Sequence, residues 1–140
     1  PRLEFDAFAV CQTLSAPDET LFVWGNYAYP YYLGKRKPAT RFVIAEYLVP
    51  YWEKYLNHVT EFHESELNPL HQKNLQHLMM DLQTHQPKLI LDTSSSAHFP
   101  NWSMYPLESI SVLKVFVQEH YFLWGTVEGI KIWKKIGPQS

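Results

Sequence analysis

Residues 20–24 read TLFVW, and residues 88–92 read KLILD. Both runs are short, continuous and apolar. Strands of this kind are typical of a parallel sheet whose two faces are covered by helices. Polar residues follow at once, since Gly25 and Asn26 come after the first run and Asp92 ends the second. The two runs therefore predict two buried strands of an α/β fold.

Amphipathic segments alternate with these strands. Apolar residues recur at helical spacing over residues 2–14 and again from Trp52 to Phe62, which predicts two helices. Asn68 and Pro69 form a strong start for a third helix, because Asn is a favoured N-cap and Pro suits the first helical position. Pro87 prevents that helix from continuing.

The rest of the chain completes the alternation. We expect a short helix over residues 27–33, a weaker strand over residues 41–44 and a helix that opens at Pro106. Residues 121–124 and 130–133 flank two glycines and predict a β-hairpin. The predicted fold is α/β, with a mainly parallel sheet flanked by helices and a C-terminal antiparallel hairpin at its edge.

The composition bounds the function. The chain has 140 residues, enough for one domain, with 16% aromatic residues and a formal net charge of −2. A net charge so close to zero argues against a protein that binds nucleic acid through a general excess of basic residues, so we expect no nucleic-acid partner. A single cysteine excludes an internal disulfide, and no run reaches the roughly 18 apolar residues that cross a bilayer.

Seven histidines raise the question of a metal site. Zinc-binding helices carry histidines at i and i+4, whereas successive histidines here are 5, 8, 6, 8, 13 and 22 residues apart. A phosphate-binding loop needs several small residues, and Gly25 is a lone glycine. We therefore expect no metal and no cofactor in this chain.

The loop after the second strand has a catalytic interpretation and a simpler one. Three serines, Ser94 to Ser96, lie between Asp92 and His98, so a small serine hydrolase is one alternative. The simpler interpretation is a polar loop at a strand end. Because α/β folds bind ligands at such ends, three residues are the best-placed binding candidates. They are Asn26, Asp92 and Ser94.

One dense basic cluster lies beside two tyrosines, Tyr31 and Tyr32. The cluster consists of Lys35, Arg36, Lys37 and Arg41. Basic residues with neighbouring tyrosines suit a phosphate, an anionic lipid headgroup or a membrane interface. This leaves open a free-standing module that binds a phosphorylated small molecule. The structural alternative is a solvated turn over packed tyrosines, with Arg41 as a buried-edge arginine that fixes the loop by bidentate hydrogen bonds.

The stripe between residues 52 and 62 also has two interpretations. Its apolar members are Trp52, Tyr55, Leu56, Val59 and Phe62. We expect them to pack in the core. A membrane-surface helix is less favoured, because the polar face of the segment lacks the Lys and Arg bias of such helices.

Residues 18–43 read DETLFVWGNYAYPYYLGKRKPATRFV. A strand that ends in WG and a polar residue, followed by YYL-G-R and P-A-T-R-F, resembles a domain of bacterial membrane glycosyltransferases of the GT-C type. These enzymes are similar to dolichyl-phosphate-mannose protein mannosyltransferases and to the lipid A aminoarabinose transferase, and the domain is their C-terminal extramembrane part. Residues 86–94, QPKLILDTS, and the stretch from Tyr105 to Trp133 resemble later parts of the same domain.

The resemblance implies a transferase that uses a polyprenyl-phosphate-linked sugar and keeps its catalytic acids in the membrane part. No catalytic residue is therefore carried over to this chain. The chain begins at Pro1 and shows no signal segment, so we expect residues 1–140 to be a single soluble α/β domain excised from a longer polytopic membrane protein. It would lie on the periplasmic or outer face of the cytoplasmic membrane.

In that setting the domain would cap the membrane active site. Its partner would be the membrane part of the same polypeptide, and it would help to bind the lipid-linked sugar or the acceptor. The candidate residues for a surface that binds substrate or membrane are Tyr31, Tyr32, Arg36, Arg41, Asn26 and Asp92.

Overall fold

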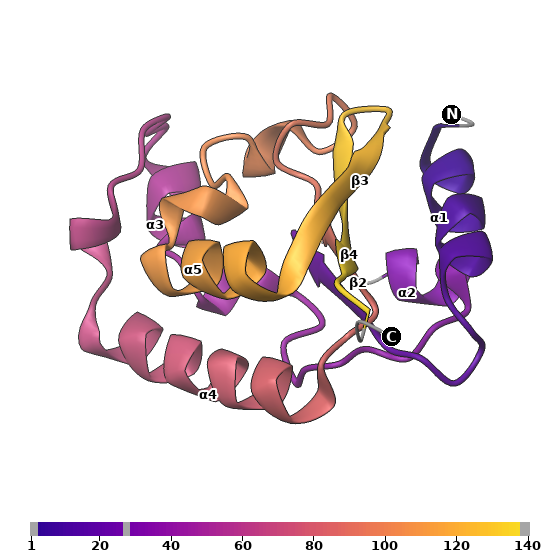
Figure 1. Ribbon diagram of the computed structural model, residues 1–140. Helices are drawn as coiled ribbons and strands as arrows, with labels where there is room; N and C mark the ends of the chain where they lie inside the picture. The colour runs from indigo at the N-terminus through magenta and orange to yellow at the C-terminus, as the bar shows by residue number, and fades with distance from the viewer. Residues whose placement is uncertain (1–2, 27–28, 138–140) are drawn as a thin grey trace.

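The computed structural model describes residues 3–26 and 29–137. Over these ranges a four-stranded sheet lies between two layers of helices (Figure 1). Helices α1 (Leu3–Leu14) and α2 (Tyr29–Gly34) lie on one side of the sheet. Helices α3 (Tyr51–Leu56), α4 (Pro69–His85) and α5 (Ser111–His120) lie on the other. The α/β class predicted from the sequence is confirmed.

The sheet has the strand order β1-β2-β4-β3. Strands β1 (Leu21–Trp24) and β2 (Leu89–Asp92) pair in parallel, and each of their residues is buried. Strand β4 (Ile130–Lys135) runs antiparallel to β2, and β3 (Tyr121–Val127) runs antiparallel to β4 at the outer edge. The hairpin predicted for the C-terminal part is therefore present.

The prediction of a mainly parallel sheet is wrong, because two of the three strand pairings are antiparallel. Continuous apolar runs indicate strands buried on both faces, and they do not specify the direction of the neighbouring strand. The hairpin places β4 directly beside β2, where a parallel neighbour was expected.

Residues 41–44 do not form the predicted strand. Pro38 makes a single bridge with Leu21, and the chain then turns away from the sheet. The Thr40 hydroxyl accepts a hydrogen bond from the main-chain N–H of Phe42, and the N–H of Arg41 donates to Asp81 on α4. These local contacts take up the donors that a strand would have offered to the sheet.

The predicted helices over residues 2–14, over residues 27–33 and after Asn68 are present as α1, α2 and α4, and residues 2, 27 and 28 lie outside the described residues. The helix predicted to open at Pro106 begins later, at Ser111, as α5. At the start of α4, Asn68 Oδ1 accepts a hydrogen bond from the N–H of His71, and His71 Nδ1 accepts one from the N–H of Asn68. Short 3₁₀ turns complete the structure. They are Ala45–Tyr47, Glu64–Glu66, Pro100–Trp102 and Leu107–Ser109.

Helix α3 is shorter than the helix predicted from Trp52 to Phe62. The side chain of Asn57 donates to the carbonyl of Glu53, and His58 has a positive φ of 55°. A left-handed residue of this kind ends a helix. The stripe is therefore divided between α3 and the loop that follows it.

The core is rich in large aromatic residues. Trp24, Trp102 and Tyr105 are fully buried, and the indole Nε1 of Trp24 donates to the carbonyl of Tyr105 at 2.7 Å. The rings of Trp24 and Trp102 meet edge to face at 5.4 Å. Over the described ranges, no helix has the length and apolar character needed to cross a bilayer.

Candidate functional site

The carboxyl ends of β1 and β2 lie side by side. Trp24 is the ladder partner of Asp92, and Asn26 follows two residues later. Asp92 is buried, and its Oδ1 accepts a hydrogen bond from the N–H of Ser94 at 2.9 Å. Its Oδ2 accepts one from the N–H of Leu107 at 3.1 Å. The carboxylate therefore ties the start of the long loop after β2 to the end of that loop.

Burial raises the pKa of Asp92 above the ordinary value for an aspartate. The hydrogen bonds from Ser94 and Leu107 and the positive charge of Lys131 lower the pKa, but they do not cancel the effect of burial. Lys131 lies opposite Asp92 on β4, and its Nζ is 3.4 Å from Glu108 Oε1. Both carboxylate oxygens of Asp92 are thus occupied by main-chain N–H groups of the protein.

Gly25 allows close contact between the two strand ends. A Cβ at Gly25 would lie 2.4 Å from Thr93 Oγ1, which donates a hydrogen bond to the carbonyl of Trp24 at 3.0 Å. Protein atoms therefore fill the space directly between the strand ends. Beside them, Asn26 Oδ1 is buried and makes no hydrogen bond within residues 3–26 and 29–137.

The serine loop packs against the turn of the C-terminal hairpin. Gly129 has a φ of +80°, and a Cβ there would lie 2.6 Å from the carbonyl oxygen of Ser95, so glycine is required. Ser96 is buried, and its hydroxyl accepts a hydrogen bond from the main-chain N–H of His98 at 3.3 Å. These are the contacts of a polar loop that folds on itself, and they give the serine-hydrolase alternative no support.

Tyr31 closes the outer edge of β1. Its side chain is 6% exposed, and its hydroxyl accepts a hydrogen bond from the N–H of Val23 at 2.8 Å. On the same edge, the N–H of Leu21 donates to the carbonyl of Lys37, and the carbonyl of Leu21 accepts from the N–H of Ala39. Unpaired strand edges promote aggregation, and these contacts satisfy the edge. Burial also raises the pKa of Tyr31.

Arg36 closes the C-terminal end of α1. Its Nη2 donates to the carbonyls of Ser15 at 2.9 Å and Gln12 at 3.3 Å, and its Nε donates to the hydroxyl of Ser15 at 2.9 Å. A cation at this end also complements the helix dipole. The guanidinium that a phosphate would need is thus already bound, whereas Lys35 and Lys37 are exposed.

Arg41 forms a bidentate pair with Asp81 of α4. Its Nη2 lies 2.9 Å from Oδ1, and its Nε lies 3.0 Å from Oδ2. The two hydrogen bonds of the structural alternative are present, although the Arg41 side chain is 53% exposed and not buried. The neighbouring Tyr32 is 83% exposed. Among the six candidate residues, Asn26 and Asp92 lie at the neighbouring ends of β1 and β2, and the N–H of Arg36 donates to the carbonyl of Tyr31 at 3.3 Å. Arg41 is held at a different place, against α4.

A surface that the sequence analysis assigned to the core is exposed. We call the two exposed rings of Trp52 and Tyr55 on α3 the aromatic platform. Trp52 is 49% exposed and Tyr55 is 50% exposed, and Leu56 and Val59 beside them are also exposed. The core interpretation of the stripe is wrong for these four residues: Trp52, Tyr55 and Leu56 lie on an exposed face of α3 itself, and Val59 lies in the loop after it. Asn57 and His58 were the sequence signal for that end.

The fifth member of the stripe behaves as predicted. Phe62 is partly buried and packs against the core, with its ring 5.1 Å from that of Tyr105. The anchor beneath the platform is Tyr51, which is 7% exposed. The stripe thus joins a buried aromatic cluster to an exposed one.

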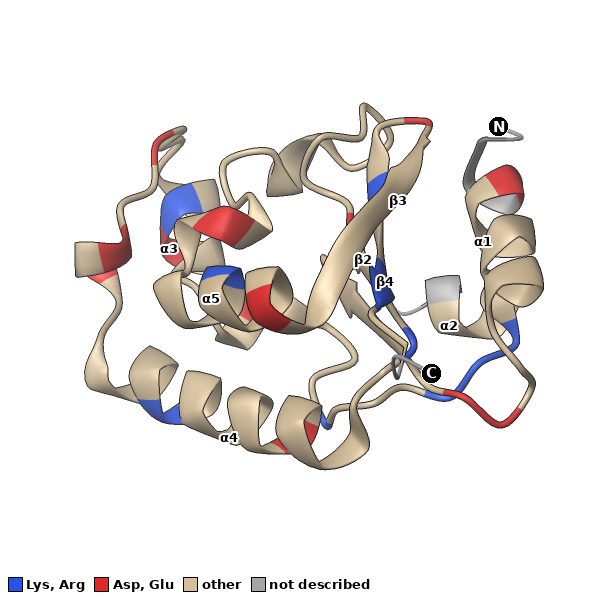
Figure 2. Cartoon of the chain, viewed as in Figure 1, with Lys and Arg blue, Asp and Glu red and all other residues tan. Residues whose placement is uncertain are grey.

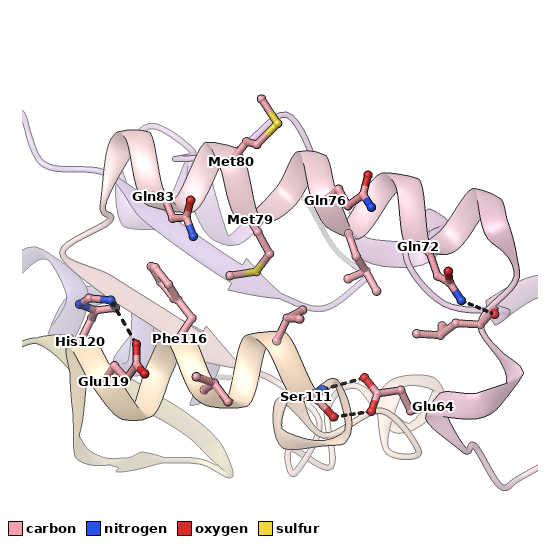
Figure 3. Close-up of a pocket in the computed structure, with 14 residues that line it drawn as sticks. Glu64, Gln72, Gln76, Met79, Met80, Gln83, Ser111, Phe116, Glu119 and His120 are labelled. Atoms are coloured by element: carbon pink, nitrogen blue, oxygen red, sulfur yellow. Dashed lines mark hydrogen bonds and ion pairs between the residues drawn. The ribbon is translucent and has the colours of Figure 1, made fainter.

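A groove of about 990 Å³ runs between α4 and α5 (Figure 3). Met79 from α4 and Phe116 from α5 point toward one another across it, and Gln76 and Gln83 stand along the α4 side. At one end Glu64 accepts hydrogen bonds from the N–H and the hydroxyl of Ser111. No local sequence pattern predicts this groove, because it forms only when two helices distant in the chain are packed together.

Within residues 3–26 and 29–137, no group of three or more His, Cys, Asp and Glu side chains is placed to hold a metal ion. Comparisons of the chain with protein-family models, with curated proteins and with solved structures found no match.

Proposed function

We propose that this chain is the extracytoplasmic domain of a bacterial membrane glycosyltransferase of the GT-C type. In this proposal the membrane part of the same polypeptide carries the catalytic groups and uses a polyprenyl-phosphate-linked sugar. The domain caps that active site and helps to bind the acceptor or the lipid-linked donor. It performs no catalysis of its own.

The observation that carries the proposal is the way residues 18–43 fold. This stretch bears the resemblance to the glycosyltransferase domain, and its described residues, 18–26 and 29–43, make contacts that hold the fold together. It contains β1, the Tyr31 hydroxyl that closes the edge of β1, and Arg36, which closes α1. Among the residues that carry the resemblance, Tyr31 and Arg36 therefore hold the fold together, which agrees with a shared domain fold.

The exposed apolar surface agrees with a domain that contacts other parts of a larger protein. The α4–α5 groove and the surface around α3 both present large apolar side chains to solvent, including Met80, Trp52 and Leu56. Such surfaces often mark interaction sites. A domain that caps a membrane active site needs at least one of them.

The reading frame upstream of Pro1 tests this proposal. We expect it to encode several apolar segments of about 20 residues each, long enough to cross a bilayer. An initiator Met shortly before Pro1, with no such segment on either side of the chain, would overturn the proposal.

A further inference from the structure

The aromatic platform packs on the buried ring of Tyr51. The Tyr51 ring stacks on that of Tyr55 at 6.1 Å, with an interplanar angle of 8°, and meets Trp52 edge to face at 5.2 Å. Tyr51 itself lies 6.0 Å from the buried ring of Trp102. The two half-exposed rings, Trp52 and Tyr55, are 5.9 Å apart and nearly perpendicular, at 84°. They form a fixed corner whose outer sides face solvent.

The charges around this corner are acidic. Between residues 42 and 72 the chain has five glutamates and one lysine. That lysine, Lys54, is turned inward, where it is 7% exposed and its Nζ lies 2.5 Å from Glu66 Oε2. Figure 2 shows Asp and Glu prevailing over Lys and Arg in the region of α3 and the loop after it. Glu53, next to Trp52 on α3, and Glu61, in the loop after α3, are both exposed.

The acidic surroundings decide between two classes of partner. Exposed Trp, Tyr and Leu suit a membrane interface, but anionic lipid would be repelled here, and the single basic residue of residues 42–72, Lys54, is turned inward instead of facing a membrane. An uncharged molecule with many hydroxyl groups meets no such repulsion. Its hydroxyls can donate hydrogen bonds to the carboxylates, which accept only.

We infer that the aromatic platform is a binding surface for a neutral glycan. One face of a pyranose ring presents C–H groups, and an aromatic ring face carries the negative part of its quadrupole, so the two faces attract each other. Trp52 and Tyr55 would each stack on one sugar ring, and Glu53 would accept hydrogen bonds from hydroxyls at the rim. The choice of a glycan as ligand rests on the proposed function.

Titration of the chain with neutral oligosaccharides tests this inference. The probes are cellotetraose, mannotetraose and chitotetraose, and the readout is the ¹H–¹⁵N spectrum with the indole Nε1–H signals of the five tryptophans resolved. We expect at least one probe to shift the Trp52 signal saturably and to leave that of Trp124 in place. Trp124 on β3 is 43% exposed and serves as a matched exposed tryptophan.

Variants locate the site. Trp52→Ala and Tyr55→Ala should each weaken binding about tenfold or more, since a stacked ring contributes on the order of a tenfold change in affinity. Trp52→Phe keeps an aromatic face and should retain most of the affinity, and Trp124→Ala should bind as the wild type does. Near-ultraviolet circular dichroism checks that each variant is folded.

Three results would overturn the inference. The first is that none of the probes binds at about 10 mM, the weak end of measurable affinity. The second is that Trp124→Ala reduces binding as much as Trp52→Ala. The third is that phosphatidylcholine vesicles bind the wild-type chain but not the Trp52→Ala variant, while no glycan binds. That result would make the platform a membrane contact.

The test of the glycan surface and the test of the proposed function can fail independently. If the upstream reading frame encodes membrane spans and no glycan binds, the glycan surface alone is wrong. If glycans bind at Trp52 and the reading frame opens shortly before Pro1, the membrane glycosyltransferase is wrong and the glycan surface stands.

Discussion

The hydroxyl of Tyr31 accepts a hydrogen bond from the main-chain N–H of Val23 at 2.8 Å. In this position the side chain replaces one hydrogen-bonding group of a neighbouring strand and closes the edge of β1. The tyrosine that the sequence offered as a contact for sugar or membrane is thereby 6% exposed and part of the fold. Its neighbour Tyr32, which is 83% exposed, is the tyrosine of this pair that is accessible to a ligand.

Replacement of Tyr31 by phenylalanine tests the closing of this edge. Tyr31→Phe leaves the N–H of Val23 buried without its acceptor, and we expect the free energy of unfolding to fall by about 1–3 kcal/mol. Urea denaturation measures the change. Tyr32→Phe is the matched control and should leave stability unchanged. Equal effects of the two substitutions would contradict the assignment.

The contact of Arg36 with α1 predicts that substitution of Arg36 lowers stability more than substitution of the neighbouring lysines. Arg36→Gln removes hydrogen bonds to the carbonyls of Gln12 and Ser15, and we expect a loss of about 1–3 kcal/mol in the free energy of unfolding. Lys35→Gln and Lys37→Gln remove the same charge from exposed side chains and should have little effect. A similar loss in all three variants would show that the charge of the loop, and not the helix contact, matters.

The packing of Gly25 against Thr93 predicts coupling between two positions. Gly25→Ala places a Cβ 2.4 Å from Thr93 Oγ1, in a buried site where the threonine cannot move without losing its bond to Trp24. We expect Gly25→Ala to lower the melting temperature strongly. Thr93→Ala should partly restore the stability lost in Gly25→Ala. The double variant should therefore lose less stability than the two single losses added together. Strictly additive effects would show that the two residues do not interact.

The pair of Arg41 and Asp81 predicts part of the acid denaturation of the protein. The guanidinium of Arg41 holds the pKa of Asp81 below its ordinary value. Because the pKa is lower in the folded state, the pair stabilises the protein above the unfolded-state pKa of Asp81. That contribution is lost as the pH falls through the folded-state pKa.

Unfolding curves at a series of acidic pH values measure this effect. In Asp81→Asn the decrease in stability on acidification should be smaller than in the wild type. Asp18→Asn, which changes an exposed aspartate in the turn after α1, is the control and should follow the wild-type curve. If Asp81→Asn also follows the wild-type curve, the pair does not contribute to acid stability.

Local patterns in the sequence predicted most of the individual elements. The apolar runs that end at Trp24 and Asp92 form β1 and β2, and the Asn68–Pro69 start defines α4, because caps and periodicity act over a few neighbouring residues. The direction and order of the strands could not be predicted in this way. They depend on where the hairpin docks, and nothing within Ile130–Lys135 specifies that neighbour.

The candidate site was predicted less well, for a related physical reason. The strand-end positions of Asn26 and Asp92 follow from the apolar runs, but the partners of Asp92, Tyr31 and Arg36 lie on other elements. A buried tyrosine that pairs with a strand and an exposed tyrosine that binds a ligand look alike in sequence. In the same way, the stripe around Trp52 would be core only if another element covered it, and periodicity does not show whether one does.

Transfer of sugar by the full-length polypeptide tests the central claim most directly. Membranes that contain the full-length protein would be supplied with a radiolabelled polyprenyl-phosphate sugar, beside membranes with a form that lacks residues 1–140 and beside this chain alone. We predict transfer by the full-length protein, reduced or absent transfer by the truncated form, and none by the chain alone. Transfer by the truncated form equal to that of the full-length protein, or no membrane part in the reading frame, would contradict the account.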